Sequence, residues 1–296
     1  MGQPLVSVIT ITRNRGKLIG RCIKSVLNQS YKNIEYIIVD GASEDNTDDV
    51  INSFHDSRIR FIKLKSNWPI VKTINYGVEI SNGKYITFLD SDDEYLPSKV
   101  EKQVKLIESL SPDFGMVYCW MTYYDERTRE IDHIHKCDLR GFVGDEVIER
   151  PKVSGTPTFM FRRDAFVENG GWRDNIGIIS DFEMAARFCQ KWKVDYVPES
   201  LINVYVNHST QRMSDDINSK EFHRNHIIFE EYFLAQFKDA FDRRPEYRAP
   251  HLYALVQHNS AIGEKSKAWN YFIKYLRVKS PLKNKTTCLY HLLFGK

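Results

Sequence analysis

The sequence has no hydrophobic segment long enough to cross a membrane and almost no net charge. Of its 296 residues 42% are hydrophobic, yet no apolar run approaches the roughly 20 residues that a membrane-spanning helix needs. The net charge of +3 is too small to indicate a nucleic-acid-binding protein. A strand-like run begins by Leu5, with no basic and then apolar leader before it. We therefore expect a cytoplasmic protein that binds no nucleic acid.

Cysteine is also scarce, and its spacing argues against both a disulfide-rich protein and a zinc-binding protein. The five cysteines are odd in number, and their spacing is typical of neither a disulfide framework nor a zinc site. Unpaired thiols fit a reducing compartment. The chain likewise lacks internal repeats and low-complexity segments. Its composition is that of an ordinary globular protein, with room for one large domain and an appendage.

The first hundred residues alternate short apolar runs with amphipathic segments. The apolar runs are rich in Val, Ile and Thr, as buried parallel strands are. They lie at residues 5–12, 34–39, 59–64 and 85–89. The segments between them show the apolar stripe of a helix and lie at residues 18–27, 45–54 and 70–80. This alternation predicts a parallel sheet with right-handed crossovers.

The rest of the chain is mixed at first and helical at its end. We expect helices at 96–110 and 182–191, and strands at 114–124, 158–162, 194–197 and 201–206, with Pro198 between the last two. Residues 125–155 give no clear pattern. Three further helices are predicted, at residues 221–241, 252–262 and 266–278. The sequence thus indicates an α/β domain of residues 1–215 and a C-terminal helical extension of residues 216–296.

Three carboxylates follow the apolar run 85–89 within four residues: Asp90, Asp92 and Asp93. Acidic groups at the mouth of a buried strand cost desolvation energy unless a cation lies close by. Mg²⁺ and Mn²⁺ prefer oxygen ligands and usually keep substrate phosphates in their coordination shell. In open α/β sheets, ligands bind outside the carboxyl ends of the strands. The stretch predicts a metal site for a phosphate ester or, alternatively, an acidic cap, Asp92 or Asp93, for a helix that begins near Pro97.

Four ordered elements resemble glycosyltransferase family 2 and together cover about residues 4–215. They are the run 6–12 with Asn14 and Arg15, Asp40 with Ser43, Asp45 and Thr47, the stretch Asp90-Ser91-Asp92-Asp93, and Ser180-Asp181 before a helix. The resemblance implies a Rossmann-like GT-A sandwich with a mostly parallel central sheet. It also implies an inverting transfer of a sugar from a nucleotide-diphosphosugar, which we expect to be a UDP-sugar, to an acceptor hydroxyl.

The resemblance also implies how the donor is bound. Asp92 corresponds to the direct ligand of a divalent cation, Mn²⁺ or Mg²⁺, and Asp90 to a residue that meets the ribose or the metal through water. Residues assigned to the nucleotide are Thr10, Thr12, Arg13, Asp40, Asp90 and Ser91. Arg13 replaces the family's usual residue type and either stacks on the base or is solvated. His208 is a weaker candidate for the metal, with a surface imidazole as its alternative.

An inverting reaction needs a general base opposite the leaving group, and Asp181 matches the family's base. The family often has Glu-Asp where this chain has Ser180-Asp181, so the first carboxylate is missing. The alternative is that Asp181 only caps the helix 182–191, and Glu183 is a lesser rival for the base. On the acceptor side the resemblance places Thr156, Trp172 and Asp93. Trp172 either stacks on a sugar or packs in the core.

The remaining expectations concern partners and competing functions. A glycan or lipid-linked acceptor is implied, as in surface polysaccharide synthesis. The tail is basic around Lys274 and Arg277, so it either contacts the inner face of a membrane or packs as a helical lid. A nucleotidyltransferase on the same sheet is disfavoured because residues 13–16 contain a single glycine. A nucleotide-sugar-binding module without activity is disfavoured by the intact acids Asp90, Asp92 and Asp181.

Overall fold

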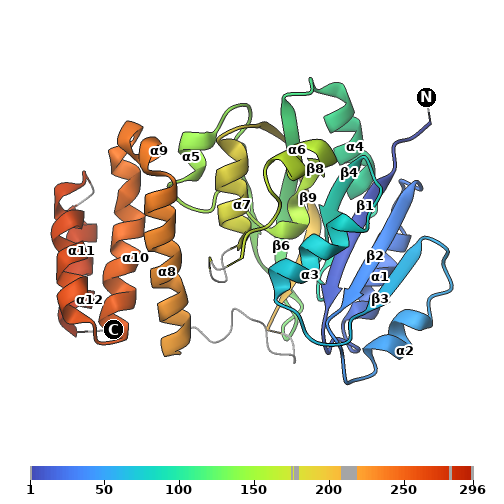
Figure 1. Ribbon diagram of the computed structural model, residues 1–296, viewed down its shortest axis with the longest axis horizontal. Helices are drawn as coiled ribbons and strands as arrows, with labels where there is room; N and C mark the ends of the chain where they lie inside the picture. The colour runs from blue at the N-terminus through green and yellow to red at the C-terminus, as the bar shows by residue number, and fades with distance from the viewer. Residues whose placement is uncertain (1, 175, 177–179, 208–218, 280–281, 295–296) are drawn as a thin grey trace. The chain divides into compact units, whose positions relative to one another are not determined.

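The computed structural model describes residues 2–174, 176, 180–207, 219–279 and 282–294. The described residues form an α/β protein around one nine-stranded sheet (Figure 1). None of their helices is long and apolar enough to cross a membrane.

The chain forms two compact units. The first, which we call the sheet unit, comprises Met1–Val143, Val153–Trp172 and Lys191–Thr210. The second, the helical unit, comprises Gly144–Lys152, Arg173–Gln190 and Gln211–Lys296. Two stretches from the middle of the chain therefore pack with the C-terminal helices rather than with the sheet.

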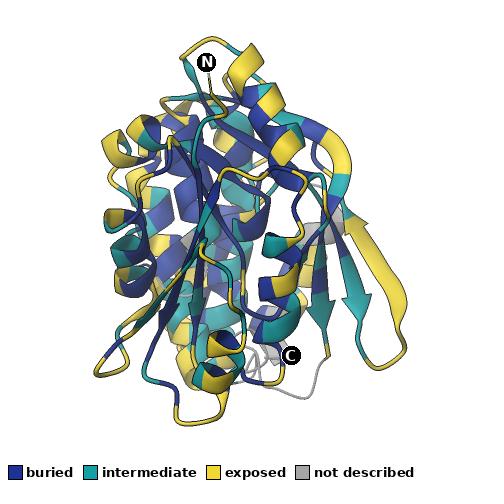
Figure 2. Cartoon of the chain, turned by 90° about the vertical axis from the view of Figure 1, so that its right-hand side faces the viewer, coloured by how far each residue is buried: buried dark blue, intermediate teal, exposed yellow. Residues whose placement is uncertain are grey.

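Four parallel strands form at one side of the sheet, as the sequence predicts. Their order is β3-β2-β1-β4. They span Val6–Thr12 (β1), Ile34–Asp40 (β2), Ile59–Lys63 (β3) and Tyr85–Phe88 (β4). The connecting helices are α1 (Ile19–Leu27), α2 (Thr47–Asn52) and α3 (Ile70–Glu79). Every residue of β4 and nearly every residue of β1 and β2 is buried, which explains their almost continuous apolar sequence (Figure 2).

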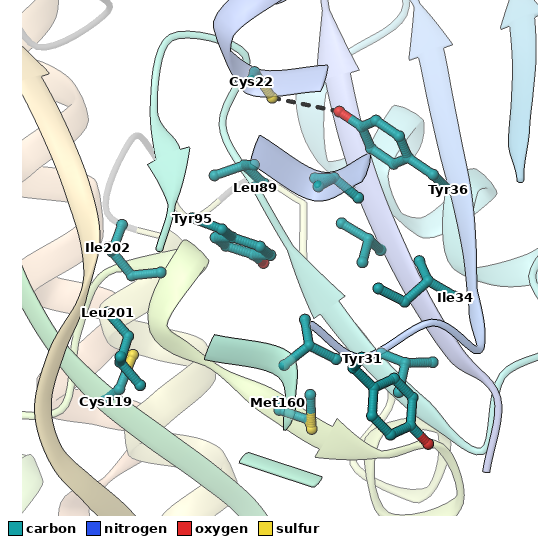
Figure 3. Packing of buried hydrophobic residues seen from close by; sticks show 14 of the residues in the cluster. Cys22, Tyr31, Ile34, Tyr36, Leu89, Tyr95, Cys119, Met160, Leu201 and Ile202 are labelled. Carbon is teal, nitrogen blue, oxygen red and sulfur yellow. Dashed lines mark hydrogen bonds between the residues drawn. The ribbon is translucent and has the colours of Figure 1, made fainter. Parts of the chain in front are cut away.

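Helices cover both faces of this parallel part. On one face Val8, Tyr36 and Tyr95 belong to a core cluster with Cys22 of α1, and the Tyr36 hydroxyl lies 3.4 Å from the Cys22 sulfur (Figure 3). On the other face α3 approaches closely, because a Cβ on Gly77 would lie 2.7 Å from a methyl carbon of Ile9. The arrangement is the expected three-layer sandwich.

The other side of the sheet is mixed. Its strands are β5 (Glu94–Tyr95), β6 (Phe114–Asp125), β7 (Glu130–His135), β8 (Met160–Arg162) and β9 (Lys193–Val206). Strand β8 lies antiparallel between β4 and β6, whereas β9 is parallel to β6. The short β5 and the hairpin strand β7 pair antiparallel with β9 and β6. The parallel arrangement predicted for the first four strands is therefore confirmed, and among the later strands only the β6–β9 pair is parallel.

One predicted strand break is wrong. Pro198 was expected to separate two strands, but β9 is continuous across it. The register passes from Cys119 opposite Val197 to Trp120 opposite Ser200, so Pro198 and Glu199 bulge out of the pairing. A bulge tolerates proline because the missing N–H is not needed for the ladder there.

The remaining helices are divided between the two units. The sheet unit contains α4 (Lys99–Ser109), α6 (Arg163–Glu168) and a 3₁₀ turn at Thr156–Thr158. The helical unit contains α5 (Gly144–Val147), α7 (Ser180–Cys189), α8 (Lys220–Gln236), α9 (Lys238–Arg243), α10 (Arg248–Ala261), α11 (Lys265–Arg277) and α12 (Leu282–Phe294). The helix predicted over 221–241 is interrupted at Phe237, where α8 ends.

Lys99 of α4 is completely buried beneath β4. Its Nζ donates to the Thr87 hydroxyl at 2.5 Å and lies 4.0 Å from the centre of the Tyr95 ring. Burial lowers the pKa of Lys99 to about 7, because the charged amine loses its hydration. The native protein therefore favours the neutral amine, whereas the unfolded chain keeps it protonated up to about pH 10.

This difference predicts a pH-dependent stability. Between pH 7 and 10 the unfolded chain binds a proton at Lys99 that the native protein does not, so native stability should rise with pH. The maximum slope from one such group is about 1.4 kcal/mol per pH unit. Replacing Lys99 with Met should remove this rise, as measured by urea unfolding followed by circular dichroism at several pH values.

The matched control is Lys105→Met, which removes an exposed lysine from the same helix. It should keep the wild-type pH dependence. An identical pH profile for Lys99→Met and wild type would contradict the assignment of the shift to Lys99.

Candidate functional site

The carboxyl ends of β1, β2 and β4 meet at one edge of the sheet. Thr12, the last residue of β1, pairs in register with Asp40, the last residue of β2. The backbone N–H of Leu89, one residue past β4, donates to the carbonyl of Ile9 at 3.0 Å. The fold thus brings together the strand ends that carry the predicted nucleotide residues and the acidic stretch that begins at Asp90.

Asp40 is fully buried and organises the turn after β2. One of its oxygens accepts from the Ser43 backbone N–H at 2.8 Å, and the other accepts from the Ser43 hydroxyl. The turn passes through Ala42 at φ 60°, in the left-handed region. A base N–H would be a further donor to a carboxylate that Ser43 already holds in place.

This turn is tied to the turn after β1. The backbone N–H of Asn14 donates to the Ser43 hydroxyl at 2.8 Å, and that of Arg15 donates to the Thr47 hydroxyl at 2.9 Å. The backbone N–H of Gly16 donates to Asp45 at 3.1 Å. The hydroxyl and the backbone N–H of Thr47 also donate to Asp45. Although burial opposes the shift, the hydrogen bonds from Thr47 and Gly16 lower the pKa of Asp45 and keep it charged. The polar residues shared with the family therefore have a local role, since they lock two adjacent turns together.

The three predicted residues at the end of β1 differ in exposure. Thr10 is buried, and its hydroxyl donates to the Leu89 carbonyl at 2.8 Å, so it ties β1 to the end of β4. The Thr12 hydroxyl is buried and has no hydrogen-bond partner within the described parts of the chain. Arg13 is exposed. At this edge of the sheet, Thr12 thus offers a hydroxyl without a described hydrogen bond, and Arg13 offers an exposed guanidinium.

The acidic stretch forms a tight turn. Asp90 is exposed, while Ser91, Asp92 and Asp93 are buried. The backbone N–H of Asp93 donates to the carbonyl of Asp90 at 3.1 Å, and a carboxylate oxygen of Asp93 accepts from the backbone N–H of Tyr205 at 3.2 Å. The turn leads directly into β5. Helix α4 begins only at Lys99 after Ser98, so the alternative role of Asp92 or Asp93 as its cap is wrong.

Arg21 of α1 holds this turn from the side, which the sequence did not indicate. Its guanidinium donates to the Asp92 carbonyl at 2.8 Å and to the Glu126 carboxylate at 2.8 Å. It also lies 3.5 Å from the centre of the Tyr205 ring. Arg21 lies on the polar side of α1. The sequence analysis used only the apolar stripe of this helix, and Arg21 belongs to no motif.

The turn can supply two oxygen ligands to a metal but not a complete cage. No group of three or more His, Cys, Asp or Glu side chains is placed to hold a metal ion in the regions that the structure describes. Asp90 and Asp92 fit a cation such as Mg²⁺, which takes one or two carboxylates and completes its shell with water and substrate phosphates. Burial raises the pKa of nearby Cys22 to about 12, and the charges of Asp93 and Asp92 add to this, so its thiol stays protonated and is no ligand. His208 lies outside the described residues.

Trp172 packs in the core of the sheet unit. It is 4% exposed, and its ring meets Phe88 edge to face at a centroid distance of 5.5 Å. The Asn75 side chain clamps its backbone, donating to the Trp172 carbonyl at 2.8 Å and accepting from its N–H at 3.1 Å. This is the packing that the sequence left open as the alternative to sugar stacking. Thr156, also expected on the acceptor side, is half-buried in the 3₁₀ turn.

In the helical unit, two neighbouring acids of α7 differ in how far they are buried. Glu183 is fully buried, and Arg187 donates to its two oxygens at 2.8 and 3.0 Å. The Tyr232 hydroxyl also donates to it, at 3.3 Å. Asp181 is only partly buried, and its oxygen accepts from the backbone N–H of Phe182 at 2.9 Å. Of these two carboxylates, Asp181 is the one that solvent reaches.

Helix α7 begins at Ser180, two residues before residue 182, where a helix capped by Asp181 would begin. Asp181 therefore lies within the first helical turn, where the helix dipole favours its negative charge.

Comparison with known proteins places the chain in a family. Residues 7–170 match the family model described as Glycosyl transferase family 2. An uncharacterized glycosyltransferase of Rickettsia typhi is 34% identical over 227 residues, which cover 74% of this chain and 69% of that protein. The UDP-Glc:alpha-D-GlcNAc-diphosphoundecaprenol beta-1,3-glucosyltransferase WfaP of Escherichia coli is 38% identical over 123 residues, or 42% of this chain and 47% of that protein. The chain thus spans less than half of WfaP.

Solved structures share the fold at low sequence identity. Residues 1–349 of Staphylococcus aureus TarS, in complex with UDP-GlcNAc, superpose with a TM-score of 0.65 at 15% identity, covering 99% of this chain and 92% of that one. The mannosyltransferase PcManGT of Pyrobaculum calidifontis, in complex with GDP-Man and Mn²⁺, gives a TM-score of 0.59 at 16% identity, covering 100% and 86%. The sheet, its acidic turn and these similarities lead to one conclusion: the chain belongs to glycosyltransferase family 2 and is a glycosyltransferase with a GT-A-like fold.

Proposed function

We propose that this glycosyltransferase transfers a sugar, with inversion and with the help of a divalent metal, from a nucleotide-diphosphosugar to an acceptor hydroxyl in surface-glycan synthesis. The observation that carries the proposal is the acidic turn 90–93 at the carboxyl end of β4, beside the ends of β1 and β2. A diphosphate donor brings negative charge to this edge, and a metal held by acids is the group that accommodates it.

The donor is proposed to be a UDP-sugar. The TarS complex contains UDP-GlcNAc and the name of WfaP specifies UDP-Glc, whereas the PcManGT complex contains GDP-Man. In this chain the base and ribose are assigned to the joined turns after β1 and β2, where Thr12 offers an unused buried hydroxyl and Arg13 an exposed guanidinium. Asp40, Asp90 and Ser91 complete the proposed nucleotide site. Thr10 contributes to it through the hydrogen bond from its hydroxyl to the Leu89 carbonyl.

Asp92 and Asp90 are proposed to hold Mn²⁺ or Mg²⁺. When bound, the metal neutralises charge that develops on the departing diphosphate. The neighbouring Asp93 is kept in position by the Tyr205 backbone, and Arg21 fixes the Asp92 carbonyl. The Mn²⁺ in the PcManGT complex supports this assignment. His208 remains a candidate ligand outside the described residues.

Asp181 is proposed to take the proton from the acceptor hydroxyl as the new bond forms. Its partial exposure leaves it able to meet an acceptor, while Glu183 is held by Arg187. Thr156, Asp93 and Trp172 belong to the proposed acceptor and sugar side, with Trp172 acting through packing rather than stacking. The acceptor is proposed to be a glycan or a lipid-linked sugar, as the name of WfaP specifies for that enzyme. Residues 1–215 and 216–296 are proposed as catalytic domain and extension, at the inner membrane face.

A panel of nucleotide sugars tests the proposed reaction as a whole. In the presence of Mn²⁺ or Mg²⁺, slow release of nucleoside diphosphate is expected from one donor, because water can replace the acceptor. EDTA should suppress this release because it removes the metal. Product formation is measured by coupled detection of UDP or GDP. Pyrophosphate-dependent exchange would instead indicate a nucleotidyltransferase. The absence of both turnover and a metal effect would indicate a binding module.

Replacing Asp92 with Asn should remove metal-dependent binding of the nucleotide. The substitution keeps the shape of the side chain but loses its charge, so UDP affinity measured by calorimetry should no longer respond to Mn²⁺. Turnover of the donor is expected to fall by about 10²- to 10³-fold. Asp164→Asn, an exposed acid of α6, is the matched control and should behave as wild type. An unchanged Mn²⁺ response in Asp92→Asn would refute the ligand assignment.

Replacing Asp181 with Asn should separate binding from chemistry. UDP affinity is expected to stay at the wild-type value, while nucleoside diphosphate release falls by about 10²- to 10⁴-fold because the proton acceptor is lost. Asp174→Asn removes an exposed acid from the same unit and serves as the control. Near wild-type turnover in Asp181→Asn would mean that another group is the base.

A further inference from the structure

Helix α11 carries a row of exposed apolar side chains. Trp269, Ile273 and Leu276 are 43%, 45% and 44% exposed, and their spacing places them on one face of the helix. A different face of α11 supplies the core that this helix shares with α10 and α12 (Figure 1), through Ala268, Phe272 and Tyr275. The exposed row is therefore additional to the side chains that α11 needs for its own packing.

The row is held in place from inside. The Trp269 ring meets Phe272 edge to face at a centroid distance of 5.7 Å, which fixes its direction while much of the ring stays in solvent. Single exposed apolar residues are common on protein surfaces and need no explanation. Three in a continuous row on one helix, including a tryptophan, form an organised surface instead.

Positive charge surrounds this row. Residues 264–279 contain one acidic side chain, Glu264, which lies 3.8 Å from Lys267, and five basic ones: Lys265, Lys267, Lys274, Arg277 and Lys279. All five basic side chains are exposed. Lys265 lies one helical turn before Trp269, and Arg277 lies one turn after Ile273, so cations bracket the apolar row along the same face.

We propose that this surface, the α11 face, binds an anionic phospholipid bilayer. We define the α11 face as the row Trp269, Ile273 and Leu276 together with the two cations that bracket it, Lys265 and Arg277. An apolar row rimmed by cations lets a helix lie along the interface, with Trp and aliphatic groups at the acyl boundary and the cations on lipid phosphates. The helix lies on the bilayer and does not span it.

Charge distinguishes this occupant from a second copy of the chain. A twofold dimer through the α11 face would place the same patch of both copies against each other. The cations of the two copies would then be brought close together, and Glu264 offsets only Lys267, so repulsion opposes association. An anionic bilayer supplies the missing negative charge at the same time as the apolar phase.

The test is co-sedimentation of the full chain with phosphatidylcholine vesicles that contain or lack phosphatidylglycerol. The wild-type protein should bind only the anionic vesicles, and added salt should weaken binding. The double variant Lys265→Gln/Arg277→Gln should lower the partition coefficient roughly thirtyfold. Ile273→Gln/Leu276→Gln should also lose binding while its melting temperature stays unchanged, because both side chains are exposed.

Matched substitutions on α8 provide the controls. Lys220→Gln/Arg224→Gln removes the same net charge, and Ile228→Gln removes an apolar side chain that is 51% exposed. These variants should bind the vesicles as the wild type does. Tryptophan quenching by brominated phosphatidylglycerol gives a second readout, and it should fall in Trp269→Phe, which keeps an apolar ring at this position.

Three results would overturn the proposal: no binding of the wild type to anionic vesicles, wild-type binding by both α11 double variants, or a change in sedimentation velocity that shows the α11 face to join two copies. The proposal does not depend on the proposed sugar transfer. Donor hydrolysis measured without vesicles reports on the reaction, whereas vesicle binding measured without donor reports on the α11 face.

Discussion

The structure depends on the parallel pairing of β1 with β2 and β4. Parallel strands must all end at the same edge, so three chain segments that are distant in sequence deliver their polar ends to one place. The hydrogen bonds from Gly41 to the Thr12 carbonyl and from Leu89 to the Ile9 carbonyl continue this pairing beyond the strands. The candidate donor site is therefore a property of the sheet, and the loops only complete it.

The polar residues at this edge mostly fix one another in place. Ser43 occupies both oxygens of Asp40, and Asn14 and Thr47 join the two neighbouring turns. In the helical unit Arg187 engages Glu183 in the same way. A family motif thus contains supporting residues as well as residues free for a ligand. Burial and hydrogen bonding distinguish the two kinds, and the unused Thr12 hydroxyl and the exposed Arg13 side chain belong to the second.

The sequence predicted the parallel strands and the position of the acidic turn well, because apolar runs and carboxylates leave a local signal. It failed where the cause is distant in sequence. The continuity of β9 across Pro198 depends on its register with β6, and the clamp on Trp172 depends on Asn75 nearly one hundred residues away. Arg21 reaches Asp92 and Glu126 from a helix whose sequence shows only its apolar stripe. No local pattern encodes such contacts.

The support that Arg21 and Tyr205 give to the acidic turn has a consequence for how the enzyme would work. Protein groups already hold the backbone of Asp92 and the side chain of Asp93, so the turn keeps its shape before any cation arrives. In the proposed reaction Asp90 and Asp92 would therefore meet a cation on a turn that is already formed, so that binding a metal would require little rearrangement of the chain.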